Sequence, residues 1–261
     1  MKLQFLGTGA ADWEISRRRE GMEWRRFSST LVDDTLLIDP GPHIFDFAEA
    51  QGLPHLFDNV RDIIVTHSHP DHLNSRNLLR VCSISRGCRV WGDAASLRKL
   101  TRELGENNAI DFRTVTVGRE FAAGDFRILP LRSNHGTTDR DEVTLNYAII
   151  RGNRKLFYGL DTGWLPYETW CTIRHAAFDC MVFELTMGDI VPGDDRIFGH
   201  TSIPMLEIML QTMRRQGCMK AGCRAVVSHL ARTLHTDHAS TCARLAPLGV
   251  DVAYDGMIYE F

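Results

Sequence analysis

Four side chains that commonly bind metal ions occur within six residues of this sequence: His67, His69, Asp71 and His72. In an extended turn, alternation would direct His67 and His69 to the same side, with Asp71 and His72 on the turn that follows. One ion would then take two imidazoles, and a second ion would take a carboxylate oxygen and an imidazole. Mixed nitrogen and oxygen ligands suit Zn²⁺ and also Mn²⁺, Fe²⁺ or Ni²⁺. A lone histidine is more often an ordinary surface or core residue, but this density after an apolar strand indicates a metal site.

Other polar side chains also stand where apolar runs end. His67, Asp161 and His229 each follow a short apolar run that we expect to be a strand. Loops at strand ends converge on one edge of a sheet, which is where α/β proteins place their sites. We therefore expect these three side chains to share one site, although Asp161 or His229 alone would be a weak candidate.

The order of the expected elements favours an α/β fold. Short β-branched runs predict strands, and apolar residues repeated every three or four positions predict helices. The expected strands are residues 35–38, 63–66, 126–131, 146–150, 155–158, 181–183 and 225–227, and the expected helices are residues 77–85, 95–104 and 202–215. Because early strands are joined tightly and later ones alternate with helices, we predict mixed sheets flanked by helices in one domain, residues 1–261.

Composition is ordinary for a globular enzyme of 261 residues, with 44% hydrophobic and 24% charged residues. The formal net charge of −3 argues against a protein that coats nucleic acid broadly. The sequence has no apolar run of the ~18 residues that a membrane span needs, and its short apolar start predicts a first strand rather than a signal peptide. Seven cysteines without a repeated spacing predict reduced thiols and a cytoplasmic location.

The segment from Thr66 to His72 resembles the His-x-His-x-Asp-His signature of the metallo-β-lactamase superfamily. Four more segments resemble that family and occur in the family's order: Leu37-Ile38-Asp39-Pro40-Gly41, Asn134-His135-Gly136, Leu160-Asp161-Thr162 and Ser228-His229. Together they span almost the whole chain. The resemblance implies a four-layer αββα sandwich, in which two mixed β-sheets are flanked by helices.

The resemblance also implies two divalent metal ions, with zinc the first expectation and manganese, iron or nickel as alternatives. Carried over residue by residue, the ligands are His67, His69 and His135 for one ion, Asp71, His72 and His229 for the other, and Asp161 as a bridge. Two nearby cations repel each other, and a shared carboxylate and a shared hydroxide reduce that repulsion. The bridging hydroxide would be the nucleophile, and Asp39 would brace the metal loop.

The residue type at the bridging position reduces the range of reactions that we expect. Asp161 stands where the common zinc β-lactamases have a cysteine, which disfavours antibiotic hydrolysis. His200 lies in a segment that resembles the phosphodiesterase branch, and Glu184 resembles the strand-end acid of that branch. A charged imidazole would protonate the leaving oxygen, and Glu184 would fix its tautomer and raise its pKa. We therefore predict His200, Glu184 and Asp71 as catalytic residues; an ordinary loop histidine is the alternative for His200.

Within this branch the chain looks closer to phosphoribosyl cyclic phosphate phosphodiesterase than to ribonuclease Z. The long arm with which ribonuclease Z grips transfer RNA would lie between His135 and Asp161, where two expected strands leave no room. The N-terminal cysteine cluster of the cyclic phosphodiesterase has no counterpart in residues 9–26, where arginines occur instead. We predict that Arg25 or Arg26 contacts a substrate phosphate; a loop that simply faces water is the alternative.

The sequence thus predicts a dinuclear metal-dependent phosphodiesterase for a small nucleotide-like or cyclic phosphodiester. Hydrolysis of a carboxyl ester, lactone or thioester at the same metals is a second interpretation, and a non-catalytic metal-binding protein is a third. The expected partners are a small phosphorylated substrate and a second copy of the chain in a homodimer, with no membrane.

Overall fold

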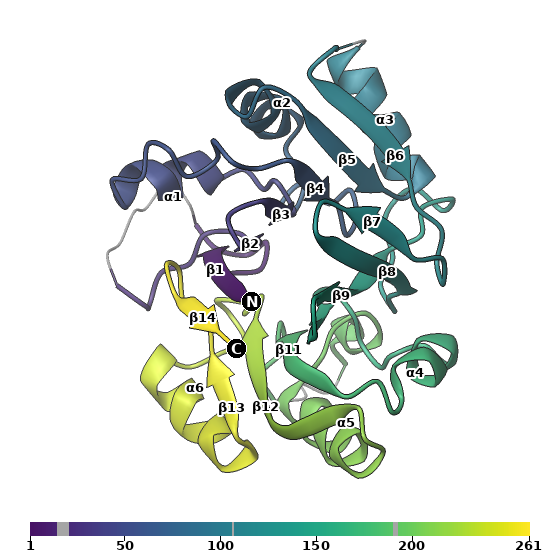
Figure 1. Ribbon diagram of the computed structural model, residues 1–261. Coiled ribbons are helices and arrows are strands. Elements are labelled where there is room, and N and C mark those ends of the chain that lie inside the picture. Colours follow the sequence, from purple (N-terminus) through teal and green to yellow (C-terminus); the bar gives the residue numbers. More distant parts are fainter. Residues whose placement is uncertain (15–20, 106, 190–192) are drawn as a thin grey trace.

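The computed structural model describes residues 1–14, 21–105, 107–189 and 193–261, and it contains two β-sheets that face each other (Figure 1). The first sheet consists of β1 (Lys2–Gly7), β2 (Ser29–Val32), β3 (Leu36–Ile38), β4 (Asp62–Ile64), β5 (Cys88–Gly92), β6 (Ile110–Thr114) and β14 (Ile258–Glu260). Its strand order is β14-β1-β2-β3-β4-β5-β6. The pairs from β14 to β3 are antiparallel and those from β3 to β6 are parallel, so the sheet is mixed.

The second sheet is also mixed. It consists of β7 (Phe121–Ala123), β8 (Phe126–Arg132), β9 (Leu145–Arg151), β10 (Arg154–Gly159), β11 (Phe178–Glu184), β12 (Met219–Ser228) and β13 (Val250–Val252). Its order is β13-β12-β11-β10-β9-β8-β7. Since β8 and β10 are both antiparallel to β9, and β10 to β12 are parallel, the carboxyl ends of β8, β10 and β12 lie at one edge.

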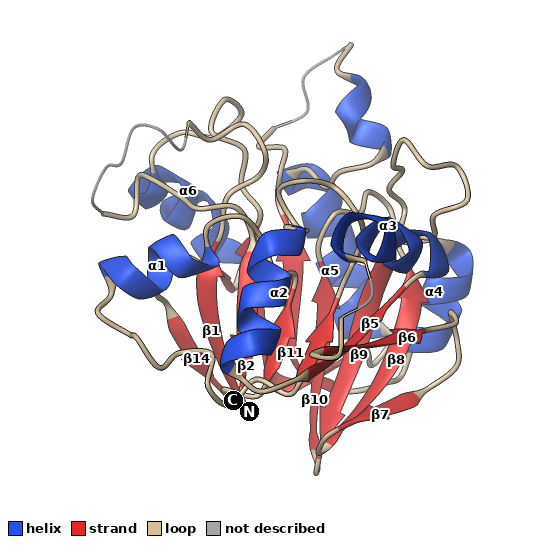
Figure 2. Cartoon of the chain, turned by 90° about the horizontal axis from the view of Figure 1, so that it is seen from above, coloured by secondary structure: helices blue, strands red, loops and turns tan. Residues whose placement is uncertain are grey.

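Helices cover the outer face of each sheet (Figures 1 and 2). The helices over the first sheet are α1 (Ile44–Ala50), α2 (Ser75–Ile84) and α3 (Ala94–Leu104), and those over the second are α4 (Tyr167–Ile173), α5 (Ile203–Arg215) and α6 (His238–Leu245). Two short 3-10 helices, η1 (Asp195–Phe198) and η2 (Ala246–Leu248), complete the described helices.

Three buried apolar clusters separate the resulting four layers. Side chains alternate along each strand, so Leu36 and Ile38 of β3 join the cluster between the sheets, whereas Leu37 joins the cluster under α1 to α3. Phe157 of β10 and Leu206 of α5 belong to the third cluster, under α4 to α6. Each buried aliphatic side chain of this kind contributes about 1.5–3 kcal/mol by leaving water. Strands that pack on both faces bury every side chain, which explains why their sequences are continuous apolar runs.

The predicted α/β architecture of two mixed sheets with flanking helices is confirmed. The expected helix at 202–215 is α5, and the Ser202 hydroxyl accepts a hydrogen bond from the backbone N–H of Met205, as an N-cap does. The sequence reading missed several short elements, which are β2, β5, β6, β7, β13, β14, α1, α4 and α6. Within the described ranges, no helix is long and apolar enough to cross a membrane.

Candidate metal centre

The candidate ligands reach one site from both sheets. The segment with His67 and His69 follows β4, and His135, Asp161 and His229 follow β8, β10 and β12. Figure 2 shows the loops gathered at one end of the strands, away from the two termini. This placement agrees with the expectation that strand ends supply the site.

Two of the candidate ligands lie in sharp backbone turns. Asp161 has φ 48° and His229 has φ 57°, and Asp39, close to the site, has φ 57°. These values are in the left-handed region, which costs roughly 1 kcal/mol for most residues other than glycine. Asp and His tolerate it better than most, so the residue types suit both the turn and the site. The turns direct the side chains out of the strand direction and into the cluster.

The first group of converging ligand atoms comes from His67, His69, His135 and Asp161, and these atoms all lie within 4.8 Å of one another. His69 Nδ1 is 2.9 Å from His67 Nε2 and 3.2 Å from His135 Nε2. Three imidazole nitrogens therefore face a common point, with the Asp161 carboxylate beside them.

The second group comes from Asp71, His72 and His229, also within 4.8 Å of one another. His72 Nε2 is 3.1 Å from His229 Nε2. Asp161 touches both groups, because its Oδ1 lies 3.0 Å from His229 Nε2 while its Oδ2 lies 3.4 Å from His67 Nε2. A carboxylate in this position is suited to bridge two cations.

The outward-facing nitrogens of several of these rings donate to fixed acceptors. His72 Nδ1 donates to Asp39 Oδ2 at 2.9 Å, and His135 Nδ1 donates to the carbonyl oxygen of Gly199 at 3.1 Å. His229 Nδ1 donates to the Thr186 hydroxyl at 2.7 Å, while that hydroxyl donates to the carbonyl oxygen of His229. Protons on the outer nitrogens leave lone pairs on the inner ones.

Inner lone pairs that face one another at about hydrogen-bond distance repel unless positive charge lies between them. The carboxylate oxygen Asp161 Oδ1 is buried and accepts no hydrogen bond from any described residue. Five imidazoles and two carboxylates form a mixed nitrogen and oxygen donor set of the kind that binds Zn²⁺ and similar divalent ions. The residues present therefore fit a pair of divalent cations.

The electrostatics of the cluster favour the unprotonated form of His67, His69, His135 and Asp161, whereas they favour a positive charge at His72. Burial, with the charge of His72, lowers the pKa of His67 to about 4, and burial also lowers the pKa of His69 and His135. Burial opposes ionisation of Asp161, but the charges of His229 and His72 hold its pKa well below the usual value. Burial would likewise lower the pKa of His72, yet Asp161 and Asp71 raise it well above normal. The negative charge that attracts a proton to His72 also attracts cations.

Asp39 supports the loop that carries the first ligands. Its Oδ1 accepts a hydrogen bond from the backbone N–H of Thr66 at 2.7 Å, and its Oδ2 accepts from the Thr66 hydroxyl and from His72. The bracing contact expected from the sequence is present. Glu142 holds the same loop from the other side by accepting from the backbone N–H and the hydroxyl of Ser68.

His200 and Glu184 form a pair beside the cluster. His200 Nδ1 donates to Glu184 Oε1 at 2.9 Å, and Glu184, which is fully buried, also accepts from the backbone N–H groups of Thr162 and Thr186. Burial alone would lower the pKa of His200, but the charge of Glu184 and this hydrogen bond raise it to about 9. The His200 ring centroid is 4.8 Å from that of His135.

A cleft of about 220 Å³ opens onto the cluster. It is lined by Ala10, Ala11, Asp12, His69, Asp71, His135, Asp161, Thr186, Arg196, His200, His229 and Ala231. The cleft is small, and its walls combine the metal-competent groups, the His200–Glu184 pair and one guanidinium group.

The family follows from comparison with known proteins. The model of the family described as "Beta-lactamase superfamily domain" matches residues 34–229. The chain belongs to this family. Ribonuclease Z from Methanopyrus kandleri (strain AV19) is 31% identical over 144 residues, which are 53% of this chain and 48% of that protein. The match therefore spans about half the length of that relative.

Solved structures share the fold of this β-lactamase superfamily domain. A diphosphatase from the PhnP family has a TM-score of 0.75 and 18% identity, over 100% of this chain and 96% of that one. Zn²⁺-bound PqqB from Methylobacterium extorquens has a TM-score of 0.76 and 14% identity, over 100% of both chains. Membership of the β-lactamase superfamily identifies the chain as a hydrolase, and the solved structures show that it has the metallo-β-lactamase fold.

Two arginines expected at the substrate are placed elsewhere in this β-lactamase superfamily domain. The Arg25 guanidinium is buried and donates to the Thr8 hydroxyl at 2.7 Å and to the carbonyl oxygen of Ala253 at 2.6 Å. Arg26 Nε donates to Asp46 Oδ2 at 2.8 Å. Neither lines the cleft. Arg17, Arg18 and Arg19 of the same arginine-rich stretch lie outside the described residues.

The structure brings three residues to the cleft that the sequence reading missed: Asp12, Thr186 and Arg196. Arg196 forms an ion pair with Asp194, with 2.6 Å between Nη2 and Oδ2. It lies only four positions before His200, and that proximity is the one signal that points to it. Thr186 lies two positions after Glu184, which is a comparable signal, whereas Asp12 comes from a distant loop and has none.

Proposed function

We propose that this hydrolase is a dinuclear metal-dependent phosphodiesterase that cleaves a small nucleotide-like or cyclic phosphodiester. The observation that carries the proposal is that the His200–Glu184 pair and the metal-competent cluster line the same small cleft. An imidazole held by a buried carboxylate is suited to protonating an oxygen leaving group, which phosphodiester cleavage requires.

Each candidate ligand has a stated role in this proposal. One cation would be held by His67, His69 and His135, the other by Asp71, His72 and His229, and Asp161 would be shared. The donor set suits zinc first, with manganese, iron or nickel as alternatives. When bound, the cations supply positive charge for phosphate oxygens and acidity for a coordinated water.

The chain's own residues would then act on the substrate. Arg196 places positive charge in the cleft wall, where it attracts a phosphate oxygen. Because His200 Nδ1 is hydrogen-bonded to Glu184, Nε2 is the nitrogen that can donate a proton to a substrate in the cleft. As the bond from phosphorus to the leaving oxygen breaks, that oxygen keeps the electron pair and takes the proton from Nε2. Glu184 stabilises the charged imidazole before the transfer and orients the ring.

Two observations bear on the size of the proposed substrate. The cleft measures about 220 Å³. Between His135 and Asp161 the chain forms a loop, β9 and β10, so this segment holds no arm of the kind that grips transfer RNA in ribonuclease Z. Both observations support a small substrate.

Hydrolysis of two chromogenic compounds tests the proposal. The purified chain is assayed with bis(p-nitrophenyl) phosphate and with p-nitrophenyl acetate, before and after a chelator, and metal content is measured by mass spectrometry. We expect two bound divalent ions per chain and phosphodiester cleavage that the chelator abolishes and added Zn²⁺ or Mn²⁺ restores. Turnover of the ester without phosphodiester cleavage would instead support an acyl hydrolase.

A further inference from the structure

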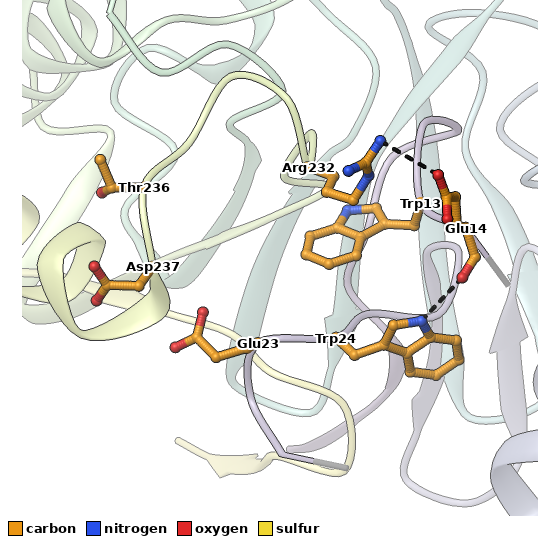
Figure 3. Close-up of a pocket in the computed structure, with 7 residues that line it drawn as sticks. All are labelled: Trp13, Glu14, Glu23, Trp24, Arg232, Thr236 and Asp237. Carbon is orange, nitrogen blue, oxygen red and sulfur yellow. Dashed lines mark hydrogen bonds and ion pairs between the residues drawn. The ribbon is translucent and has the colours of Figure 1, made fainter. Parts of the chain in front are cut away.

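A second cavity, of about 390 Å³, lies beside the catalytic cleft and has no role in the chemistry proposed above. Figure 3 shows the residues that line it, which we call the tryptophan cavity: Trp13, Glu14, Glu23, Trp24, Arg232, Thr236 and Asp237. Two indole rings and several carboxylates surround the same space. Its volume is within the range of about 300–1,000 Å³ that is usual for sites of organic ligands.

The tryptophan cavity and the cleft share one wall. Segments 10–13 and 230–232 are held together because the Ala10 N–H donates to the carbonyl oxygen of Leu230, and the Arg232 N–H donates to Asp12 Oδ1 at 2.7 Å. Ala10, Asp12 and Ala231 of this wall line the cleft, whereas their neighbours Trp13 and Arg232 line the cavity. The two spaces are therefore lined by consecutive residues of the same two segments.

The indole rings are fixed with their polar groups already used. Trp13 Nε1 donates to the carbonyl oxygen of Leu230 at 2.7 Å, and Trp24 Nε1 donates to that of Glu14 at 3.2 Å. Trp13 packs directly on Gly9, where a Cβ atom would lie 2.6 Å from the ring. Trp24 is itself buried, so the partly exposed Trp13 is the ring whose aromatic carbon surface suits stacking against another ring.

The described side chains around the tryptophan cavity are mainly acidic. They include the carboxylates of Glu14, Glu23 and Asp237 and the guanidinium of Arg232, which lies 3.9 Å from Glu14. The backbone N–H of His238 donates to both oxygens of Glu23, and that of Ser240 donates to Asp237, so these two carboxylates are held in place. Fixed acceptors of this kind select a ring that carries N–H donors.

We propose that the tryptophan cavity binds the amino-bearing nucleobase of a nucleotide-like phosphodiester while its phosphate occupies the catalytic cleft. This inference rests on the proposed function and names its substrate class. The base stacks on the indole surface, and its exocyclic amino group donates to the carboxylates at the rim. The cavity is larger than a quaternary ammonium group needs, which favours a heterocyclic base over a choline head group.

Binding of free nucleosides tests the cavity separately from catalysis, since adenosine has no phosphodiester to cleave. Calorimetry with the metal-loaded chain should show adenosine binding more tightly than uridine, which lacks the amino group. Trp13→Leu should weaken adenosine binding by about 5- to 150-fold, the range that follows from base–aromatic stacking energies, and Trp13→Phe should recover part of the loss. Trp164→Leu is the matched control, since Trp164 lines a different surface pocket.

A second variant keeps the test decisive if Trp13→Leu does not fold. Glu23→Gln should reduce the preference for adenosine over uridine, because an amide offers one acceptor oxygen where the carboxylate offers two. Equal affinity of adenosine for the native, Trp13→Leu and Trp164→Leu chains would overturn the proposal. Tighter binding of choline than of adenosine would also overturn it.

Kinetics then connect the cavity with the cleft. The ratio of kcat/KM for adenosine 2′,3′-cyclic phosphate to kcat/KM for 1-O-methylribose 2′,3′-cyclic phosphate, which has the same cyclic diester and no aromatic ring, should fall about tenfold or more in Trp13→Leu. Adenosine binding that depends on Trp13, without cleavage of any phosphodiester, would leave the cavity assignment standing and refute the phosphodiesterase. Phosphodiester cleavage without adenosine binding would refute the cavity assignment and leave the proposed phosphodiesterase standing.

Discussion

The metal cluster and the tryptophan cavity are neighbours that the chain builds in different ways. In the cluster, Asp161 and His229 are almost completely buried, follow strand ends, and have hydrogen-bonded or ion-paired surroundings. In the cavity, Glu23 and Arg232 come from loops and are exposed. The groups of the metal cluster lie directly after strands of the two sheets, whereas the groups that would select a substrate lie on longer loops. The loop residues that would select the substrate can then be replaced without altering the residues of the metal cluster.

The largest expected effect is from removing the shared carboxylate. Asp161→Ala should lose bound metal and reduce phosphodiester turnover by at least about 100-fold, because Asp161 contacts ligand atoms of both groups. Metal content by mass spectrometry and initial rates measure the two losses. An Asp161→Ala chain that keeps two metals and its activity would show that the cluster is not the catalytic centre.

His200→Ala should keep the metals while lowering kcat by about 10²- to 10⁴-fold. The loss should be largest for alkoxide leaving groups and smallest for p-nitrophenolate, which leaves without protonation. The same series with Asp161→Ala should show no such dependence on the leaving group. Equal losses for both leaving groups would remove His200 from the role of general acid.

Glu184→Gln tests the same pair through pH. Glu184 raises the pKa of His200, and the charged imidazole is the acid, so kcat should fall as the pH rises through the pKa of His200. Without the carboxylate charge, that fall should begin at lower pH, and the direction of the shift is the result to measure. A pH profile that does not move would mean that Glu184 only supports the loop.

Asp39→Asn should have a smaller effect, a loss of about 10- to 100-fold in metal affinity, because Asp39 supports His72 and Thr66 without belonging to the ligand groups. Competition with a metal indicator measures the affinity. Arg61→Ala serves as a control, since the hydrogen bonds of its guanidinium to described residues go to the carbonyl oxygens of Asp58, Val60 and Ser85, none of which is a candidate ligand. Unchanged metal affinity in Asp39→Asn would mean that the loop from Thr66 to His72 keeps its conformation without the Asp39 carboxylate.

Substitutions of two arginines should have the smallest effects on activity, and they should differ in whether they change KM or stability. Arg196→Ala should raise KM for phosphodiesters several-fold, because Arg196 lines the cleft. Arg25→Ala should leave KM nearly unchanged and destabilise the fold by about 2 kcal/mol, since it removes buried hydrogen bonds of a charged group. Thermal unfolding and steady-state kinetics separate the two effects. A raised KM in Arg25→Ala with normal stability would restore the sequence-based expectation of a phosphate contact.

The sequence predicted the features whose residues lie close together in the chain, and it missed those built from distant segments. The cluster was predictable because four candidate ligands stand in six residues and the others follow apolar runs. Elements with weak apolar patterns were missed: β6 has no fully buried residue in its burial pattern, and α4 is short. Burial of Arg25 was not predictable, since its partners Thr8, Ala253 and His238 come from distant segments. The tryptophan cavity was missed for the same reason.

The left-handed turns at Asp161 and His229 limit how this centre can evolve. A thiolate would be an acceptable metal ligand in chemical terms, but cysteine gains none of the tolerance for positive φ that Asp, Asn and His have. Exchanging either residue for cysteine would cost roughly 1 kcal/mol of backbone strain, which the binding of an ion to the thiolate would have to offset. The geometry of the peptide backbone therefore adds to the preference of the metal in deciding which amino acids are favoured at these two positions.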